Sequence, residues 1–301
     1  MMSGMDSPLL TEPLPELPAL APVSGPRGWR PWTAPAALVA GVVLAAVGGL
    51  IIDIPAALFF GVKINASKLP SGLEILDTAV QDLAFVGAAV IFAQLGGRVV
   101  AAWQLGLRPT RRWRAIGAVL LTVIAFLVFT AIWASAMEVS TKEKLLEQLG
   151  ANESTLLLLA SAALTCVVAP ICEEILFRGY FFSALSNWHG WLLAAVLTGV
   201  VFGGVHAGSA PVVDLVPLAF LGFALCVLYR VTGSLYPCIA THAINNSIAF
   251  GALEDWSAGQ TFVLMLAALA TIAVLGLLLR RSGVIGDPPA AGAASTVVAG
   301  A

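Results

Sequence analysis

The sequence predicts an all-α, polytopic membrane protein of about eight transmembrane helices that enclose an intramembrane polar cavity. Of the 301 residues, 59% are hydrophobic and only 11% are charged, and the mean hydropathy is +0.94, whereas water-soluble domains carry roughly 25% charged residues. Apolar runs of ~20 residues, the length that a helix needs to cross the hydrocarbon, recur along the chain. A few charged side chains lie inside these runs, and they predict the cavity.

The two ends of the chain differ from the rest. Residues 1–32 hold seven prolines and lack the positive start and apolar core of a secretory signal, so we expect a disordered, Pro-rich cytoplasmic tail. Residues 284–301 predict a second disordered tail. The membrane domain then covers residues 33–283, with a catalytic core at 154–253.

The first half of the membrane domain contains three apolar runs, at Thr33–Ile52, Ile75–Gly97 and Ala115–Met137. Asp53 and Pro55 are expected to end the first helix. The second run is a weaker candidate for a transmembrane helix than the other two, because its first half contains Asp77, Gln81 and Asp82. The polar stretch Glu138–Glu153, which follows the third run, predicts an exposed loop or a surface helix.

The second half begins with Ser154–Cys172, which leads directly into charged residues. A turn is expected at Asn187–Gly190. Three further spans follow, at Leu215–Tyr229, Val231–Leu253 and Trp256–Leu279.

The arginine and lysine distribution predicts the orientation. With the N-terminus inside, eleven basic residues fall on cytoplasmic segments and four on outer segments, so both termini are expected to face the cytoplasm. The Ala-rich, Arg-over-Lys composition indicates a bacterial cell membrane. The net charge of −2 gives no excess of basic residues for binding nucleic acid, so we exclude a nucleic-acid-binding protein.

The central feature is the segment 166–182, which carries Glu173, Glu174 and Arg178 in otherwise apolar sequence. A charge at bilayer depth costs at least ~2.5–3.5 kcal/mol, so it requires a partner or a function. Glu174 and Arg178 are four residues apart and can pair on one helix face. Glu173 points about 100° away and can face a cavity. The alternative is that all three are solvated at the cytoplasmic boundary.

The chain has three histidines. His189 falls in the expected turn and should be exposed, whereas His206 and His242 lie in apolar surroundings. With a turn near residue 188, an antiparallel hairpin places Glu173 and His206 at similar depth. His242 and Asn246 share one helix face. These four side chains can therefore converge in one cavity.

Such a cavity supports amide hydrolysis by two routes. In the first, a carboxylate in an apolar site acts as the general base on water, while a second imidazole and a carboxamide stabilise the oxyanion. In the second, Glu173, His206 and His242 form the three-ligand set of a catalytic zinc ion. We favour the metal-free route, because no further carboxylate or histidine stands at helical spacing to support a metal.

The order of these motifs resembles that of the CPBP family, the CAAX-protease and bacteriocin-processing intramembrane endopeptidases, which are related to type II CAAX prenyl endopeptidases. The motifs are Glu173-Glu174-x-x-x-Arg178, Phe202-x-x-x-His206 and His242-x-x-x-Asn246.

The resemblance implies a role for each position. Glu173 would activate the water with the help of His206, and His242 and Asn246 would stabilise the oxyanion. Glu174 and Arg178 would order the site and meet the carboxylate of the substrate. The resemblance implies a peptide or protein substrate associated with the bilayer, and it leaves both a zinc-dependent and a glutamate-type enzyme open.

Two other functions stay open: a proton-coupled transporter that uses the buried Glu/His cluster, and a non-catalytic immunity or scaffold protein. Asp53 and Asp214 are expected at the outer boundary and Asp82 at a helix interface, rather than along an ion path. His242 lies only ~18 Å from the cytoplasmic surface, so either the 179–197 hairpin protrudes or the 207–217 segment is re-entrant.

Overall fold

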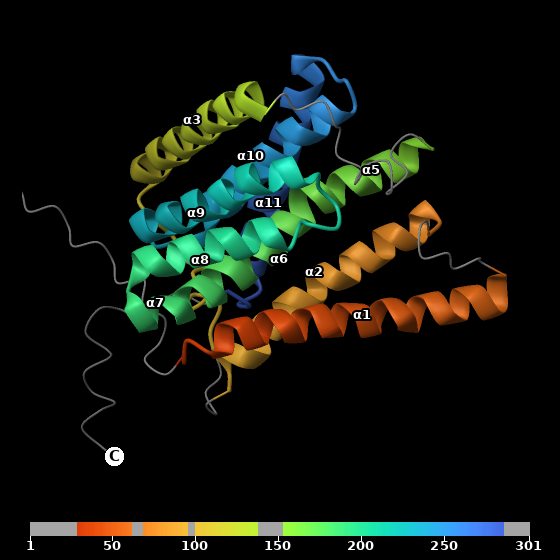
Figure 1. Cartoon of the computed structure of the whole chain (residues 1–301), viewed down its shortest axis with the longest axis horizontal. Helices are drawn as coiled ribbons and strands as arrows, with labels where there is room; N and C mark the ends of the chain where they lie inside the picture. The colour runs from red at the N-terminus through yellow and green to blue at the C-terminus, as the bar shows by residue number, and fades with distance from the viewer. Residues whose placement is uncertain (1–28, 62–68, 96–99, 138–152, 286–301) are drawn as a thin grey trace, which may run out of the picture.

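The computed structural model describes residues 29–61, 69–95, 100–137 and 153–285. Within these ranges every regular element is helical, and the helices form a bundle of eight rods (Figure 1). Six of them are long and apolar enough to cross a membrane. The predicted all-α, polytopic fold is therefore confirmed. Most of the two expected tails, and most of the polar stretch Glu138–Glu153, lie outside the described residues. Trp29, which the sequence assigned to the first disordered tail, is instead buried and donates a hydrogen bond to the Ala93 carbonyl at 3.0 Å.

Helices α1 (Thr33–Phe60) and α2 (Ser71–Ala93) form a long pair at one side of the bundle (Figure 1). The prediction that Asp53 and Pro55 end the first helix was wrong, because α1 continues through Pro55. The proline removes one intrahelical hydrogen bond, and the apolar residues after it stay helical. The helix ends at Gly61, which adopts the left-handed conformation with φ of 66°.

The charged motif lies on one continuous helical rod. Ser154 caps its start by accepting a hydrogen bond from the Leu157 N–H. The rod comprises, in order, α5 (Thr155–Ala163), the π-helical η1 (Leu164–Val168), α6 (Ala169–Glu174), the π-helical η2 (Ile175–Phe182) and α7 (Ser183–His189). It ends before Gly190, whose φ of 86° marks the break between α7 and the next helix. The turn is thus shorter than the predicted Asn187–Gly190, because Asn187 to His189 still belong to α7.

This rod forms the centre of the protein. All eight residues of η2 are buried, and Leu176, Phe177, Tyr180 and Phe182 have no exposed surface. Helices from both halves of the chain pack around it. A π-helical turn is wider than an α-helical one and is common at functional sites.

Helices α8 (Trp191–Gly204) and α9 (Leu215–Thr232) form a close hairpin after the rod. At 1.5 Å per residue, the 14 residues of α8 rise only ~21 Å, less than the ~30 Å hydrocarbon core. The chain turns at 205–211 and returns through the short helix η3 (Val212–Asp214). The sequence left open whether the 179–197 hairpin protrudes or the 207–217 segment is re-entrant. Because α8 is too short to cross the hydrocarbon core, the structure favours a re-entrant 207–217 segment.

Gly203 allows the α8–α9 contact, and its replacement by valine should open the hairpin. A Cβ atom at Gly203 would lie 2.5 Å from the Leu215 carbonyl oxygen, which is backbone and cannot rotate away. We expect a loss of about 1–3 kcal/mol in the free energy of unfolding, read as a lower melting temperature in detergent. Gly204→Val is the matched control, because a Cβ there meets nothing within 4 Å. Equal melting temperatures for the two variants would contradict the expected contact.

Helix α10 (Leu235–Leu253) is fixed at its start by the loop that precedes α3 (Arg112–Met137). The Leu235 N–H donates to the Gly106 carbonyl at 2.8 Å, and the Ser234 hydroxyl donates to the Arg108 carbonyl at 2.6 Å. The break expected at Arg230 instead falls at Gly233, because Val231 and Thr232 still belong to α9. The loop thereby positions the helix that carries His242. The last helix, α11 (Ala258–Arg281), packs beside α10.

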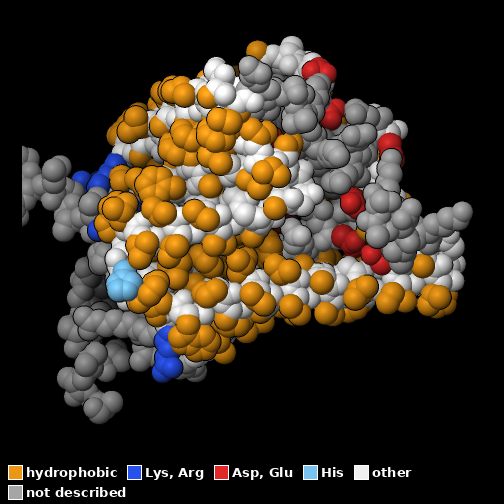
Figure 2. All heavy atoms as spheres, in the orientation of Figure 1, with side chains coloured by type: hydrophobic (Ala, Val, Ile, Leu, Met, Phe, Trp, Pro, Cys, Tyr) orange, Lys and Arg blue, Asp and Glu red, His pale blue; other side chains and the backbone are white. Residues whose placement is uncertain are grey.

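On the face shown in Figure 2 the described surface is largely apolar, and charged side chains lie toward the two ends of the bundle. Large side chains such as Phe59, Leu121 and Val263 are exposed on α1, α3 and α11, as expected of a surface that faces lipid. On the face shown in Figure 2, Arg side chains lie at the end where α1 and α3 begin, and Asp and Glu side chains lie toward the opposite end. This separation agrees with the predicted cytoplasmic position of both termini, which stays a prediction.

Candidate active site

Glu174 and Arg178 form an ion pair at the centre of the bundle. Arg178 Nη1 donates to Glu174 Oε1 at 2.7 Å, and neither side chain has any exposed surface. Arg178 Nη2 donates to the Gly222 carbonyl at 3.0 Å, and the guanidinium lies 4.6 Å above the Phe202 ring. The i, i+4 pair expected from the sequence is therefore present. Its complete burial leaves no access for a substrate carboxylate, so that implied role does not fit the structure.

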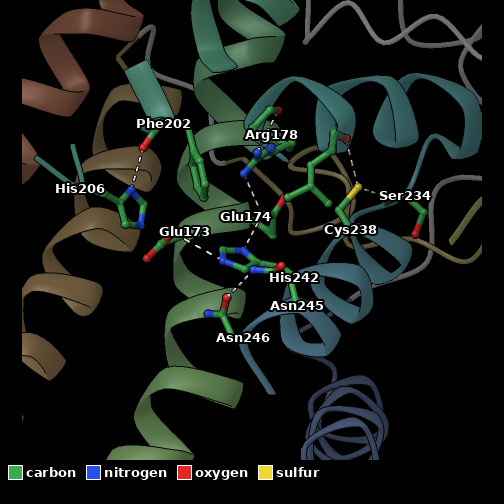
Figure 3. A network of polar contacts seen from close by, with 12 residues as sticks. Glu173, Glu174, Arg178, Phe202, His206, Ser234, Cys238, His242, Asn245 and Asn246 are labelled. Atoms are coloured by element: carbon green, nitrogen blue, oxygen red, sulfur yellow. Dashed lines mark hydrogen bonds and ion pairs between the residues drawn. The ribbon is translucent and has the colours of Figure 1, made fainter. Parts of the chain in front are cut away.

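His242 joins this pair from α10. Its Nδ1 lies 2.9 Å from Glu174 Oε1, and its Nε2 lies 3.9 Å from Glu173 Oε2 (Figure 3). A carboxylate only accepts hydrogen bonds, so Nδ1 carries the proton toward Glu174. The other ring nitrogen then faces Glu173. Glu174 thus fixes the orientation of the imidazole between two carboxylates.

Glu173 differs from its neighbour in the way that the sequence predicted. Its side chain is 15% exposed, and its Oε2 atom is buried with no hydrogen-bond partner among the described residues. It points away from the Glu174–Arg178 pair, and in Figure 3 its carboxylate lies toward both His206 and His242. A buried carboxylate oxygen without a partner is costly unless it binds water or substrate.

His206 lies in the turn that follows α8. Its Nδ1 is 2.7 Å from the Phe202 carbonyl oxygen. That oxygen can only accept, so Nδ1 donates and Nε2 is left as an acceptor that faces the side of Glu173 (Figure 3). The Phe202 ring lies 5.1 Å from the His206 ring and 5.6 Å from the His242 ring, so it separates and orients the two imidazoles.

Asn246 lies one turn beyond His242 and is held by a contact that we did not foresee. Its Nδ2 donates to the Thr165 carbonyl at 2.9 Å, while its Oδ1 accepts from Asn245 at 3.2 Å. In the π-helical η1, the Ala169 N–H bonds to Leu164, five residues back. The next donor in this register would be Pro170, which has no N–H.

The Thr165 carbonyl is therefore left free for Asn246. The signal in the sequence was Pro170, which lies inside a transmembrane run three residues before Glu173. A proline at such a position requires a local change of helical register. That change supplies the acceptor that orients the carboxamide toward the site.

The same residues do not form a zinc site as they lie. Zinc ligands sit ~2.0–2.2 Å from the ion, so their donor atoms must gather within about 4 Å of one another. Glu173 and His242 satisfy this with 3.9 Å between Oε2 and Nε2. Across residues 29–61, 69–95, 100–137 and 153–285, however, no three His, Cys, Asp or Glu side chains form a group that could hold a metal. The donor set thus does not fit the zinc alternative.

The remaining intramembrane acids lie where the sequence suggested. Asp82 is 1% exposed at the packed face of α2, whereas Asp53 and Asp214 are half-buried toward the acidic end. His189 is exposed at the end of α7. The structure therefore brings Glu173, His206, His242 and Asn246 together, whereas Asp53, Asp214 and His189 lie toward the ends of the bundle.

Comparison with known proteins confirms the resemblance over the core of the chain. Residues 155–248 match the family model of type II CAAX prenyl endopeptidase Rce1-like proteins. An uncharacterized protein from Mycoplasma capricolum is 31% identical over 87 residues, which are 29% of this chain and 25% of that protein. A Bacillus subtilis protein named "Putative membrane peptidase YdiL" is 33% identical over 81 residues, 27% of this chain and 32% of that protein. The matches thus cover 25% and 32% of these relatives, and no solved structure matches the chain.

Proposed function

From the match of residues 155–248 to the type II CAAX prenyl endopeptidases, we propose that the protein is an intramembrane endopeptidase. It hydrolyses a peptide bond with a water molecule activated by Glu173 and His206. The observation that carries the proposal is the placement of His242 between Glu174, at 2.9 Å, and Glu173, at 3.9 Å, inside an apolar bundle. Both carboxylates and the imidazole are on elements buried in the core.

Glu173 is the general base of the proposed reaction. It accepts a proton from water, and the water oxygen attacks the carbonyl carbon of the scissile bond. The π bond of the carbonyl opens to an oxyanion as the new C–O bond forms. His206 offers Nε2 as a second acceptor on the water, because its Nδ1 is already bound to Phe202. The proton then passes to the leaving amine as the C–N bond breaks.

His242 and Asn246 stabilise the oxyanion. His242 donates from Nε2 when both ring nitrogens carry a proton, while its Nδ1 stays bound to Glu174 Oε1. The Asn246 amide has two hydrogens, one of which is bound to Thr165, so the second can reach the oxyanion. Arg178 and Glu174 touch no reacting atom and act as positioning residues.

The substrate is a peptide or protein that reaches the site from the bilayer, of the CAAX type or a peptide that requires processing. His242 is seven residues into α10, ~10 Å from the start of that helix. The site therefore lies nearer the basic end of the bundle, which the arginine distribution assigns to the cytoplasm. The scissile bond should accordingly lie close to the cytoplasmic surface.

Purified protein in liposomes should cleave a membrane-tethered reporter, and His206→Ala should reduce the rate roughly 10²-fold or more, because one of the acceptors on the water is lost. His189→Ala is the matched control, since this imidazole is exposed at the end of α7. We expect the control to keep the wild-type rate. If His206→Ala cleaves as fast as His189→Ala, the proposed role of His206 is wrong.

Metal chelation should leave the cleavage rate unchanged, because the described donor groups do not gather in threes. The measurement is reporter cleavage after dialysis against a strong chelator, together with metal analysis of the purified protein. Loss of activity that returns on addition of zinc would contradict this expectation and restore the zinc-dependent route.

A further inference from the structure

Among the residues that the structure describes, Asp82 is the most deeply buried acid outside the catalytic motif. Its side chain on α2 is 1% exposed, and its Oδ2 atom has no hydrogen-bond partner among the described residues. An unpaired carboxylate in an apolar interior costs several kcal/mol of stability. Apolar packing does not account for this side chain, because leucine or alanine would fill the place at lower cost.

Asp82 faces the helix that carries Glu173. Helix α2 packs against α6 and against both π-helical stretches, and Figure 3 shows α2 passing on the side of Glu173 and His206. Ile75 and Ala79, which lie seven and three residues before Asp82 on the same side of α2, pack against the cluster that includes Leu164 and Val167 of this rod. Asp82 on α2 and Glu173 on the rod that α2 packs against therefore each have a buried oxygen that no described residue satisfies.

The acids on the neighbouring face of α2 have a different environment. Asp77 lines a cavity of about 480 Å³ between α1 and α2, together with Asp53 and Glu74. Asp77 and Asp82 thus lie on one helix, but only Asp82 faces the rod that carries the motif.

We propose that Asp82 is a positioning residue for Glu173. The two carboxyl groups cannot both be charged at low cost when they are buried close together and Arg178 is bound to Glu174. Asp82 is the member that holds the proton, and it donates a hydrogen bond toward the Glu173 carboxylate through a bridging water. Glu173 is thereby kept ionised and oriented as the base. This inference rests on the proposed peptidase function.

A hydrogen bond to a charged group contributes enough to change a rate roughly 10–100-fold. Asp82→Leu should therefore lower kcat at least about tenfold and leave KM within about twofold, because Asp82 touches no part of the substrate. The same change replaces a buried carboxyl group that no described side chain or backbone group binds with an apolar side chain, so thermal stability should stay equal or rise. Asp82→Asn keeps a neutral donor of the same shape and should retain kcat within about threefold of wild type.

The test is steady-state cleavage of the tethered reporter in liposomes by wild type, Asp82→Leu, Asp82→Asn and the control Asp77→Asn, with melting temperatures for each. The proposal is supported if Asp82→Leu lowers kcat without lowering the melting temperature, and if Asp82→Asn keeps kcat close to the wild-type value. Wild-type kcat in Asp82→Leu overturns it. The proposal is also overturned if Asp82→Asn folds but its kcat is at least tenfold below that of wild type. If Asp82→Leu does not fold, the kcat of Asp82→Asn alone tests the proposal. A wild-type protein that cuts no reporter refutes the peptidase function instead.

Discussion

Replacing Glu173 with glutamine should reduce cleavage by roughly 10³-fold, within the 10²–10⁴ range that general-base catalysis contributes. The amide keeps the size of the side chain and one hydrogen-bond acceptor, but it cannot take a proton from water. The side chain is 15% exposed and forms no ion pair with Arg178. The fold should therefore be unaffected, and the loss should appear in kcat, measured as turnover of the tethered reporter.

Glu74→Gln is the matched control for this change. Glu74 is another glutamate within a membrane helix, but it lines the cavity between α1 and α2. We expect the control to retain wild-type turnover and both variants to have the melting temperature of the wild type. A Glu173→Gln variant that retains more than a tenth of the wild-type kcat would show that another group acts as the base.

The sequence was sufficient for the parts of the site that depend on helical spacing. Glu174 and Arg178 are four residues apart on one helix, so their pairing follows from geometry alone, and Glu173 necessarily points elsewhere. The turn at Gly190 was also predictable, because glycine follows a short polar stretch between two apolar runs. These features are local, and they do not depend on which helices pack together.

The parts that could not be predicted depend on tertiary contacts. Nothing in the spacing indicates that His242 Nδ1 binds Glu174 rather than Glu173, because these residues are on different rods. The hydrogen bond from Asn246 to Thr165 requires both the π-helical register before Pro170 and the packing of α10 beside it. The continuation of α1 past Pro55 shows the same limit, since a proline that ends many helices is accepted here.

Replacing Glu174 with leucine should destabilise the protein by about 3–5 kcal/mol, the cost of leaving a buried charge without its partner. Arg178 would keep its bonds to the Gly222 carbonyl and its contact with Phe202, but neither neutralises the guanidinium. His242 would lose the acceptor for Nδ1 at the same time. We expect a large fall in melting temperature in detergent, together with loss of reporter cleavage.

A second substitution separates the effect on stability from the effect on catalysis. Replacement of a buried ion pair by apolar side chains of similar volume is often neutral or stabilising. The double variant Glu174→Leu with Arg178→Met should therefore recover most of the lost melting temperature. It should not recover cleavage, because methionine and leucine offer no acceptor to His242 and the imidazole is free to rotate or to change tautomer. A double variant that is both stable and active would show that Glu174 serves only to neutralise Arg178, and that the orientation of His242 is set by Phe202 and the surrounding helices.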